Sequence, residues 1–233
     1  MSDPDKWTMR GLDERSPLCL KTASEVRDYI LSIGLLPLFR NEISGFSVEE
    51  HVPSGHWWTD DEERDPWCWR MKLAEDKDLA YGKFFDGKAG FVSRECFPYF
   101  AALRRDGYDF DARADEGLAK PAEKRIIACF EKRNICDTAY LKENTSLKGK
   151  FEPTVVRLMA QTYLIVSGFA QRVNKMGQPY GWHMSLYTTP EVKWGYAYVT
   201  GAYNCGADEA QTYLLSKLSK NFSNGDFQHI LKL

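Results

Sequence analysis

The spacing of apolar and polar positions changes along the chain and predicts helices in several separate blocks. The first block begins with Thr22 and Glu25, which match a Thr-x-x-Glu capping box, and it stops at Gly34. Apolar residues at helical spacing then continue to mark helices farther on. The predicted helices span residues 22–33, 94–105, 121–133, 151–161 and 207–222.

Short strands are predicted between these helices. Alternation of apolar and polar residues marks strands at 70–74, 79–85 and 89–93. Asp86 and Gly87 separate the last two and predict a type I′ hairpin turn, because glycine readily takes a positive φ. Two further strands, at 163–169 and 182–187, are joined by a turn-rich segment.

The middle of the chain predicts a winged-helix module, a compact variant of the helix-turn-helix that usually docks on nucleic acid. Three helices, the second a short one that Asp137 or Thr138 can cap, precede the last two strands. We therefore predict an α+β fold in which this module packs against a second, small α/β module. The predicted organisation is a loose arm at 1–20, a helix and β-hairpin module at 21–117, the winged-helix module at 118–190 and a C-terminal helical segment at 191–233.

Composition limits the class of protein. With 233 residues, 43% of them hydrophobic, the chain is long and apolar enough to form a folded core. No apolar run approaches the roughly 20 residues that span a bilayer, and the charged start lacks the apolar region of a signal peptide. The six cysteines form no Cys-x-x-Cys pair, and the four histidines are scattered. We expect a cytoplasmic protein with reduced thiols and without a membrane segment, metal or cofactor.

Charge is distributed unevenly. The net charge is −2, yet residues 118–178 contain eleven bases against five acids, a local excess of +6. Such a local patch favours contact with phosphates. The predicted DNA-binding residues are Lys148, Lys150, Arg157, Gln161, Arg172, Lys175 and Gln178. Winged helices also mediate protein contacts, so a protein-interaction scaffold remains open as an alternative.

An acidic, tryptophan-rich stretch, WWTDDEERDPWCWR at 57–70, admits two interpretations. It could form a stacking pocket with a carboxylate at its rim, or a solvated acidic loop that tryptophans anchor to the core. In the first case the candidate catalytic residues are Asp60, Glu62 and Asp65. The candidate base-stacking residues are Trp57, Trp58, Tyr180 and Trp182.

Four stretches carry a resemblance to a known family: DPWCWR, AYGKFFDGKAGFVSRECFPYF, RRDGYDFD and NKMGQPYGW. They resemble bacterial proteins of the AlkZ-related (YcaQ-like) family, over roughly residues 20–195. The enzymatic members of this winged-helix superfamily are DNA glycosylases that excise or unhook alkylated bases. The resemblance implies winged-helix modules packed together, a concave DNA-binding face, and no metal or organic cofactor.

One departure from the family concerns catalysis. Active glycosylases of this group resemble one another in a Gln-x-Gln or Gln-x-Asp motif after an early helix, which positions the attacking water. Here the stretch after Gly34 reads LLPLFRNEISGF and holds no such pair, while Gln161 and Gln171 lie elsewhere. Apolar Leu36 or Leu38 cannot activate water. We therefore predict a DNA-binding protein without the usual catalytic motif, with an active glycosylase as the alternative.

Overall fold

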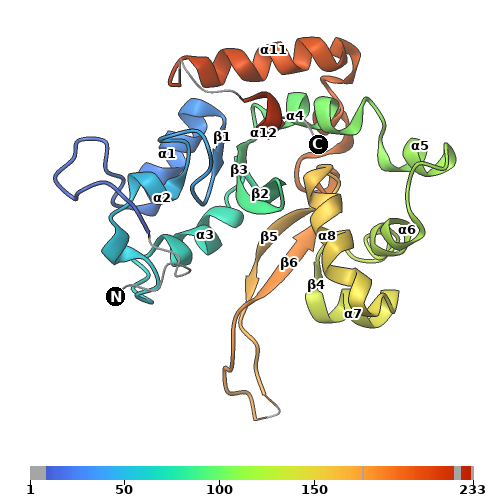
Figure 1. Cartoon of the computed structure of the whole chain (residues 1–233). Coiled ribbons are helices and arrows are strands. Elements are labelled where there is room, and N and C mark those ends of the chain that lie inside the picture. Colours follow the sequence, from blue (N-terminus) through green and yellow to red (C-terminus); the bar gives the residue numbers. More distant parts are fainter. Residues whose placement is uncertain (1–8, 175, 223–226, 232–233) are drawn as a thin grey trace.

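The computed structural model describes residues 9–174, 176–222 and 227–231, and its helices surround one antiparallel sheet (Figure 1). The sheet has six strands in the order β1-β3-β2-β5-β6-β4. Mixed helices and an antiparallel sheet confirm the α+β class. Among the described residues, no helix has the length and apolar character needed to cross a membrane.

The first predicted helix is confirmed as α1 (Ala23–Ile33). The Thr22 side chain accepts a hydrogen bond from the Glu25 N–H at 3.1 Å, and Gly34 ends the helix with a φ of 92°. The Glu25 carboxylate accepts from the N–H of Lys21 at 2.6 Å, one residue before the position that a capping box requires. The chain then enters β1 (Leu35–Pro37), which pairs with β3.

The predicted strand at 70–74 is wrong, because these residues belong to helix α3 (Pro66–Ala74). Asp65 caps this helix and Pro66 occupies its first turn, where the missing N–H costs nothing. The next two strands are confirmed as β2 (Leu79–Phe85) and β3 (Lys88–Ser93). Asp86 and Gly87 have φ values of 47° and 72°, as a type I′ turn requires.

Helices from the middle and the C-terminal part of the chain lie together next to strands β2 and β3 (Figure 1). Helix α4 (Phe97–Arg105) packs against α11 (Gly206–Ser219), with the rings of Tyr99 and Tyr213 stacked 3.8 Å apart. In α12 (Gln228–Leu231) the side chains of Ile230 and Leu231 are buried. Further α-helices are α2 (Val48–His51), α5 (Phe110–Asp115), α9 (Pro190–Trp194) and α10 (Tyr196–Val199), and short 3-10 helices span Ser54–His56, Lys148–Lys150 and Tyr203–Cys205.

The block from 121 to 188 has the element order and strand pairing of a winged helix. Its elements are α6 (Pro121–Ile127), β4 (Cys136–Asp137), α7 (Thr138–Thr145), α8 (Phe151–Ala160), β5 (Ile165–Ala170) and β6 (Met184–Thr188). Strand β4, which alternation did not predict, pairs with β6, so the local strand order is β5-β6-β4. Helix α6 is shorter than the predicted 121–133, because the chain turns after Ile127.

The winged helix and the N-terminal part share this sheet. Strand β2 pairs with β5 through Tyr81 and Val166, and the buried apolar core includes side chains from both parts. The division into two modules stays a prediction, since a shared sheet and core join them. This seam between β2 and β5 matters for function, because a large cavity lies beside it.

Candidate nucleic-acid interface

A hollow of about 920 Å³ lies where α6 and α8 begin, and we call it the basic hollow. The side chains of Lys120, Arg125, Lys148, Lys150 and Arg157 line it. The first four are exposed, and none of them forms an ion pair with a described carboxylate. The structure therefore brings the predicted Lys148, Lys150 and Arg157 together with two bases that were not among the predicted contacts.

Arg157 differs from the other four bases. Its Nε lies 2.8 Å from Oε1 of Glu123, a carboxylate that is 1% exposed. This acid also accepts a hydrogen bond from the Lys120 N–H at 2.7 Å and so fixes the start of α6. Glu123 compensates the charge of Arg157. The basic side chains of the hollow that are available to a phosphate are therefore Lys120, Arg125, Lys148 and Lys150.

Helix α8, which stands where a helix-turn-helix places its recognition helix, is largely covered. Of its ten residues only Glu152 and Pro153 are exposed. The buried Arg104 donates to the Ala160 carbonyl at 3.0 Å and so closes the C-terminal end of the helix. Gln161 is only 5% exposed, and its contact with DNA stays a prediction. A DNA groove cannot reach this helix along its length.

The hairpin between β5 and β6, the wing, projects from the body of the molecule (Figure 1). It exposes Arg172 and Gln178, and it also exposes the aromatic side chains of Tyr180 and Trp182, the latter by 74%. Lys175 lies outside the described residues. Four of the predicted contact or stacking residues therefore stand on one protruding, solvent-exposed segment.

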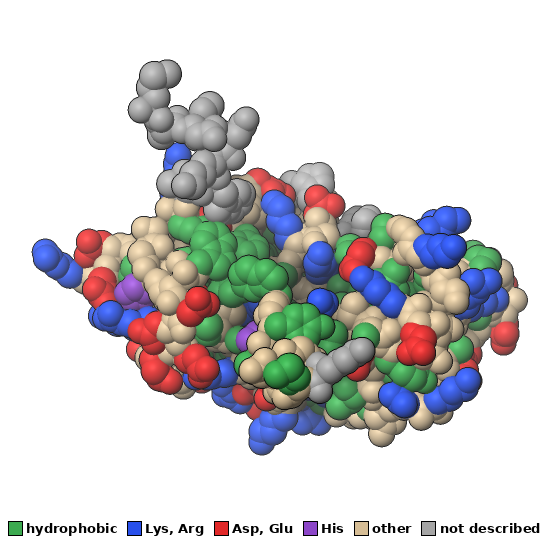
Figure 2. Space-filling view, turned by 90° about the horizontal axis from the view of Figure 1, so that it is seen from below, with side chains coloured by type: hydrophobic (Ala, Val, Ile, Leu, Met, Phe, Trp, Pro, Cys, Tyr) green, Lys and Arg blue, Asp and Glu red, His purple; other side chains and the backbone are tan. Residues whose placement is uncertain are grey.

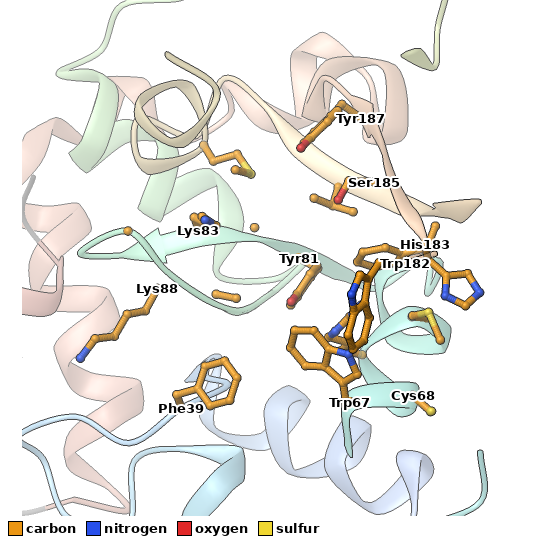
Figure 3. A pocket seen from close by; sticks show the side chains of 18 of the residues that line it. Phe39, Trp67, Cys68, Tyr81, Lys83, Lys88, Trp182, His183, Ser185 and Tyr187 are labelled. Carbon is orange, nitrogen blue, oxygen red and sulfur yellow. The ribbon is translucent and has the colours of Figure 1, made fainter. Parts of the chain in front are cut away.

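A second large space, about 860 Å³, lies between α3, the β2–β3 hairpin and the wing, and we call it the aromatic cavity (Figure 3). Trp67, Phe39 and Tyr81 contribute aromatic walls from the N-terminal part, and Trp182 faces them from the wing. Asp60 also lines the cavity. The acidic tryptophan-rich stretch and the wing, far apart in sequence, thus border the same space.

Arg70 lines the aromatic cavity with a guanidinium that lies close to two aromatic rings. Its Cζ lies 3.6 Å from the centroid of Trp67 and 4.4 Å from that of Phe169. The side chain is 7% exposed, and its buried Nε and Nη1 atoms have no hydrogen-bond partner among the described residues. Burial lowers the pKa of this guanidinium from its ordinary value, since the charged form has lost water.

The polar groups around Arg70 carry few negative charges. Lys83 and Lys88 line the same cavity and are exposed. The neighbouring Tyr81 hydroxyl stays protonated, because burial raises its pKa to about 12. Asp60 is the one carboxylate among the described lining residues, whereas three basic side chains line the cavity: Arg70, Lys83 and Lys88. The excess of positive charge favours an anion as the ligand.

The candidate catalytic carboxylates fall in different surroundings. Asp65 is fully buried and accepts from the N–H groups of Trp67, Thr59 and Asp60, so it serves as a helix cap and cannot reach a ligand. Glu62 is exposed beside Lys72. Only Asp60 of the three predicted candidates borders a cavity.

The two tryptophans that start the acidic stretch also differ. Trp57 is 5% exposed and packs against the ring of Phe39 at 5.6 Å, and its stacking on a base stays a prediction. Trp58 is 50% exposed and remains accessible. The anchoring interpretation therefore describes Trp57, whereas Trp58 is free to meet a ligand.

Two leucines in the stretch after Gly34 are buried. Leu36 in β1 is 0% exposed and Leu38 is 1% exposed. Both belong to the hydrophobic core rather than to a cavity wall.

The predictions overlooked Arg70, Tyr81, Lys83 and Lys88. The sequence did contain a signal for Arg70, because Asp65 and Pro66 are typical of a helix start. In a helix, Trp67 and Arg70 lie on one face at spacing i, i+3. Among the described residues, no group of three or more His, Cys, Asp or Glu side chains could hold a metal ion.

Acidic and basic side chains are unevenly distributed on the face that carries the wing (Figure 2). Seen from below, acidic side chains gather at the end that holds α2 and α3. Basic side chains are prominent at the opposite end, which holds α6 and α7. A polyanion would therefore be attracted to the winged-helix end of this face.

Comparisons with known proteins give one family and one solved structure. The family model described as AlkZ related matches residues 20–233. Among solved structures, the chain is similar to the Streptomyces sahachiroi DNA glycosylase AlkZ, with 12% sequence identity and a TM-score of 0.45. The match covers 87% of this chain and 52% of that chain, so the protein spans about half the length of that glycosylase. No curated protein matches.

Proposed function

The chain belongs to the AlkZ-related family, and on that premise we propose that it is a DNA-binding protein that no longer carries the usual glycosylase motif. The observation that carries the proposal is the basic hollow, where Lys120, Arg125, Lys148 and Lys150 stand exposed and without acidic partners. The four charges converge on one surface of an otherwise slightly acidic chain. Phosphate groups are the ligands that such a cluster attracts.

The contacts would involve the hollow and the wing, because helix α8 is covered. Lysine and arginine in the hollow would hold the phosphate backbone, and Arg172 and Gln178 on the wing would contact the same strand or the minor groove. Backbone contacts carry no sequence information directly. We therefore expect binding with little preference for sequence.

Buried Leu36 and Leu38 support the absence of catalysis by the family's glutamine motif. Cleavage of an N-glycosidic bond needs a group that activates water and stabilises an oxocarbenium-like state. Neither leucine supplies one. The geometry supports binding better than bond cleavage.

The experiment is duplex-DNA binding measured against salt concentration. Four phosphate contacts give a slope of about −3.6 in log affinity against log salt, so affinity should fall about 150-fold between about 50 and 200 mM. The variant with Lys148→Ala and Lys150→Ala removes two contacts and should lower the slope to about −1.8.

A matched control has Lys72→Ala and Lys77→Ala, which remove the same charge from the N-terminal part. Lys72 is exposed beside the acidic stretch, where Glu63 lies 3.4 Å from its Nζ. This control should keep the wild-type slope. Salt-independent binding, or an equal loss in both double variants, would rule out the basic hollow as the DNA contact. Absence of binding would favour the protein-interaction scaffold.

A further inference from the structure

Arg70 carries a buried charge that forms no ion pair with a carboxylate in the described part of the chain. The contrast with two other buried arginines is direct. Arg104 donates to four backbone carbonyl oxygens, and Arg105 pairs with Glu191 at 2.6 Å. Arg70 lies within salt-bridge distance of no described carboxylate, and its Nε and Nη1 have no acceptor. Buried charges are normally paired, so a ligand is the missing partner.

The geometry of the two rings limits what that ligand can be. The centroids of Trp67 and Phe169 lie 3.6 and 4.4 Å from the guanidinium carbon, and the N–H groups of a planar guanidinium donate in its plane. In-plane donors of arginine match the paired oxygens of a phosphate or carboxylate. Exposed Lys83 and Lys88 add positive charge to the same cavity.

The walls of the cavity favour a phosphate attached to an aromatic group. Trp182 is 74% exposed and points toward the space in front of Trp67 (Figure 3), as a stacking surface for a base requires. A volume of about 860 Å³ is large enough for a base, a sugar and a phosphate together. A small carboxylate would leave these aromatic walls unused.

We propose that the aromatic cavity binds a nucleotide, with its phosphate on Arg70 and its base stacked on Trp182. This inference rests on the proposed function in that DNA would supply the nucleotide as a phosphorylated strand end. A free mononucleotide has the same chemistry and is the second possible source. The site is separate from the basic hollow, since the two are lined by different residues.

The test measures binding of deoxyadenosine monophosphate and of deoxyadenosine to the full chain by titration calorimetry. We expect the nucleotide to bind at least about tenfold more tightly than the nucleoside, because charge-assisted hydrogen bonds to Arg70 are lost without the phosphate. Arg70→Met should abolish that difference, and Arg70→Lys should retain part of it. Arg94→Met is the matched control, since Arg94 stacks on Tyr198 at 4.6 Å and does not line the cavity.

A second variant tests the site if Arg70→Met does not fold by circular dichroism. Trp182→Ala changes an exposed side chain and should weaken the nucleotide about tenfold through lost stacking. Equal affinity for nucleotide and nucleoside, no binding of either, or wild-type affinity in a folded Arg70→Met or Trp182→Ala variant would each overturn the proposal.

Two further experiments distinguish a DNA strand end from a free mononucleotide as the ligand, and the aromatic cavity from the basic hollow as the binding site. Tighter binding of a 5′-phosphorylated oligonucleotide than of its unphosphorylated form would identify a strand end, and preference for the mononucleotide would identify the free nucleotide. The variant with Lys148→Ala and Lys150→Ala should bind the mononucleotide as the wild type does. Weakened duplex binding with mononucleotide binding intact would support two separate sites, whereas wild-type duplex binding in this variant would refute the basic hollow alone.

Discussion

Replacing Arg104 with methionine should strongly destabilise the protein, because this side chain links three elements from inside the core. Its Nε donates to the Leu231 carbonyl at 2.5 Å and its Nη1 to that of Ala160 at 3.0 Å. Its Nη2 donates to the carbonyls of Phe84 at 3.1 Å and Ile230 at 2.6 Å. The ends of α8 and α12 are thereby fixed to β2.

The magnitude follows from two opposing contributions. Four hydrogen bonds from a charged donor contribute roughly 6 to 12 kcal/mol in total. Burial lowers the pKa of Arg104 from 12.5 to about 10, which corresponds to an opposing cost of about 3 kcal/mol for the charged form. Because the carbonyls of α12 lie near the chain end and can reach water when that helix frays, we expect a net loss of about 3 to 5 kcal/mol.

Urea denaturation measures this loss. At a slope of about 2 kcal/mol per molar urea, the midpoint should fall by roughly 2 M. Hydrogen exchange of the Leu231 amide, which donates to Phe227 at 2.9 Å, should accelerate as α12 detaches. Arg94→Met, which removes an arginine outside this network, should cost less than about 1 kcal/mol. A similarly small loss for Arg104→Met, with Leu231 exchange unchanged, would refute the linking role.

Two further predictions concern a buried lysine and the candidate catalytic carboxylate. Burial lowers the pKa of Lys193 from 10.5 to about 8, so the folded state binds fewer protons between these values and its stability rises with pH there. The free energy of unfolding of wild type minus that of Lys193→Met should therefore grow by about 2 kcal/mol from about pH 7.5 to 9.5, and a constant difference would contradict the lowered pKa. Wild type and Asp60→Asn should both leave alkylated duplex DNA without abasic sites; sites formed by wild type and lost in Asp60→Asn would establish a glycosylase instead.

Local signals in the sequence correctly predicted those helix ends and turns whose backbone conformation depends on a few neighbouring residues. Thr22 and Gly34 delimit α1, and Asp86 with Gly87 forms the hairpin turn, because capping and positive φ act over one to four residues. Strand β4 was missed because two residues carry no periodicity. Its formation depends on pairing with β6, which lies far along the chain.

The candidate interface was less predictable than the fold. The alternation of Arg70 through Ala74 imitates a strand, and it outweighed the start signal of Asp65 and Pro66. Trp67 could have been placed beside Arg70 from helical spacing alone, but Phe169 comes from another strand and meets the guanidinium only through the tertiary fold. The same limit applies to the burial of Gln161, which depends on the tertiary fold.

The seam between β2 and β5 gives the aromatic cavity a thermodynamic role. Strands β2 and β5 meet through Tyr81 and Val166, and both residues line the cavity. Phe169 and Trp182 line it from the β5–β6 side, so the site exists only while the two halves of the sheet are joined. A ligand that binds the joined form and not the separated one stabilises the joint by linkage. Ligand affinity and cohesion between the halves are therefore two measurements of the same equilibrium.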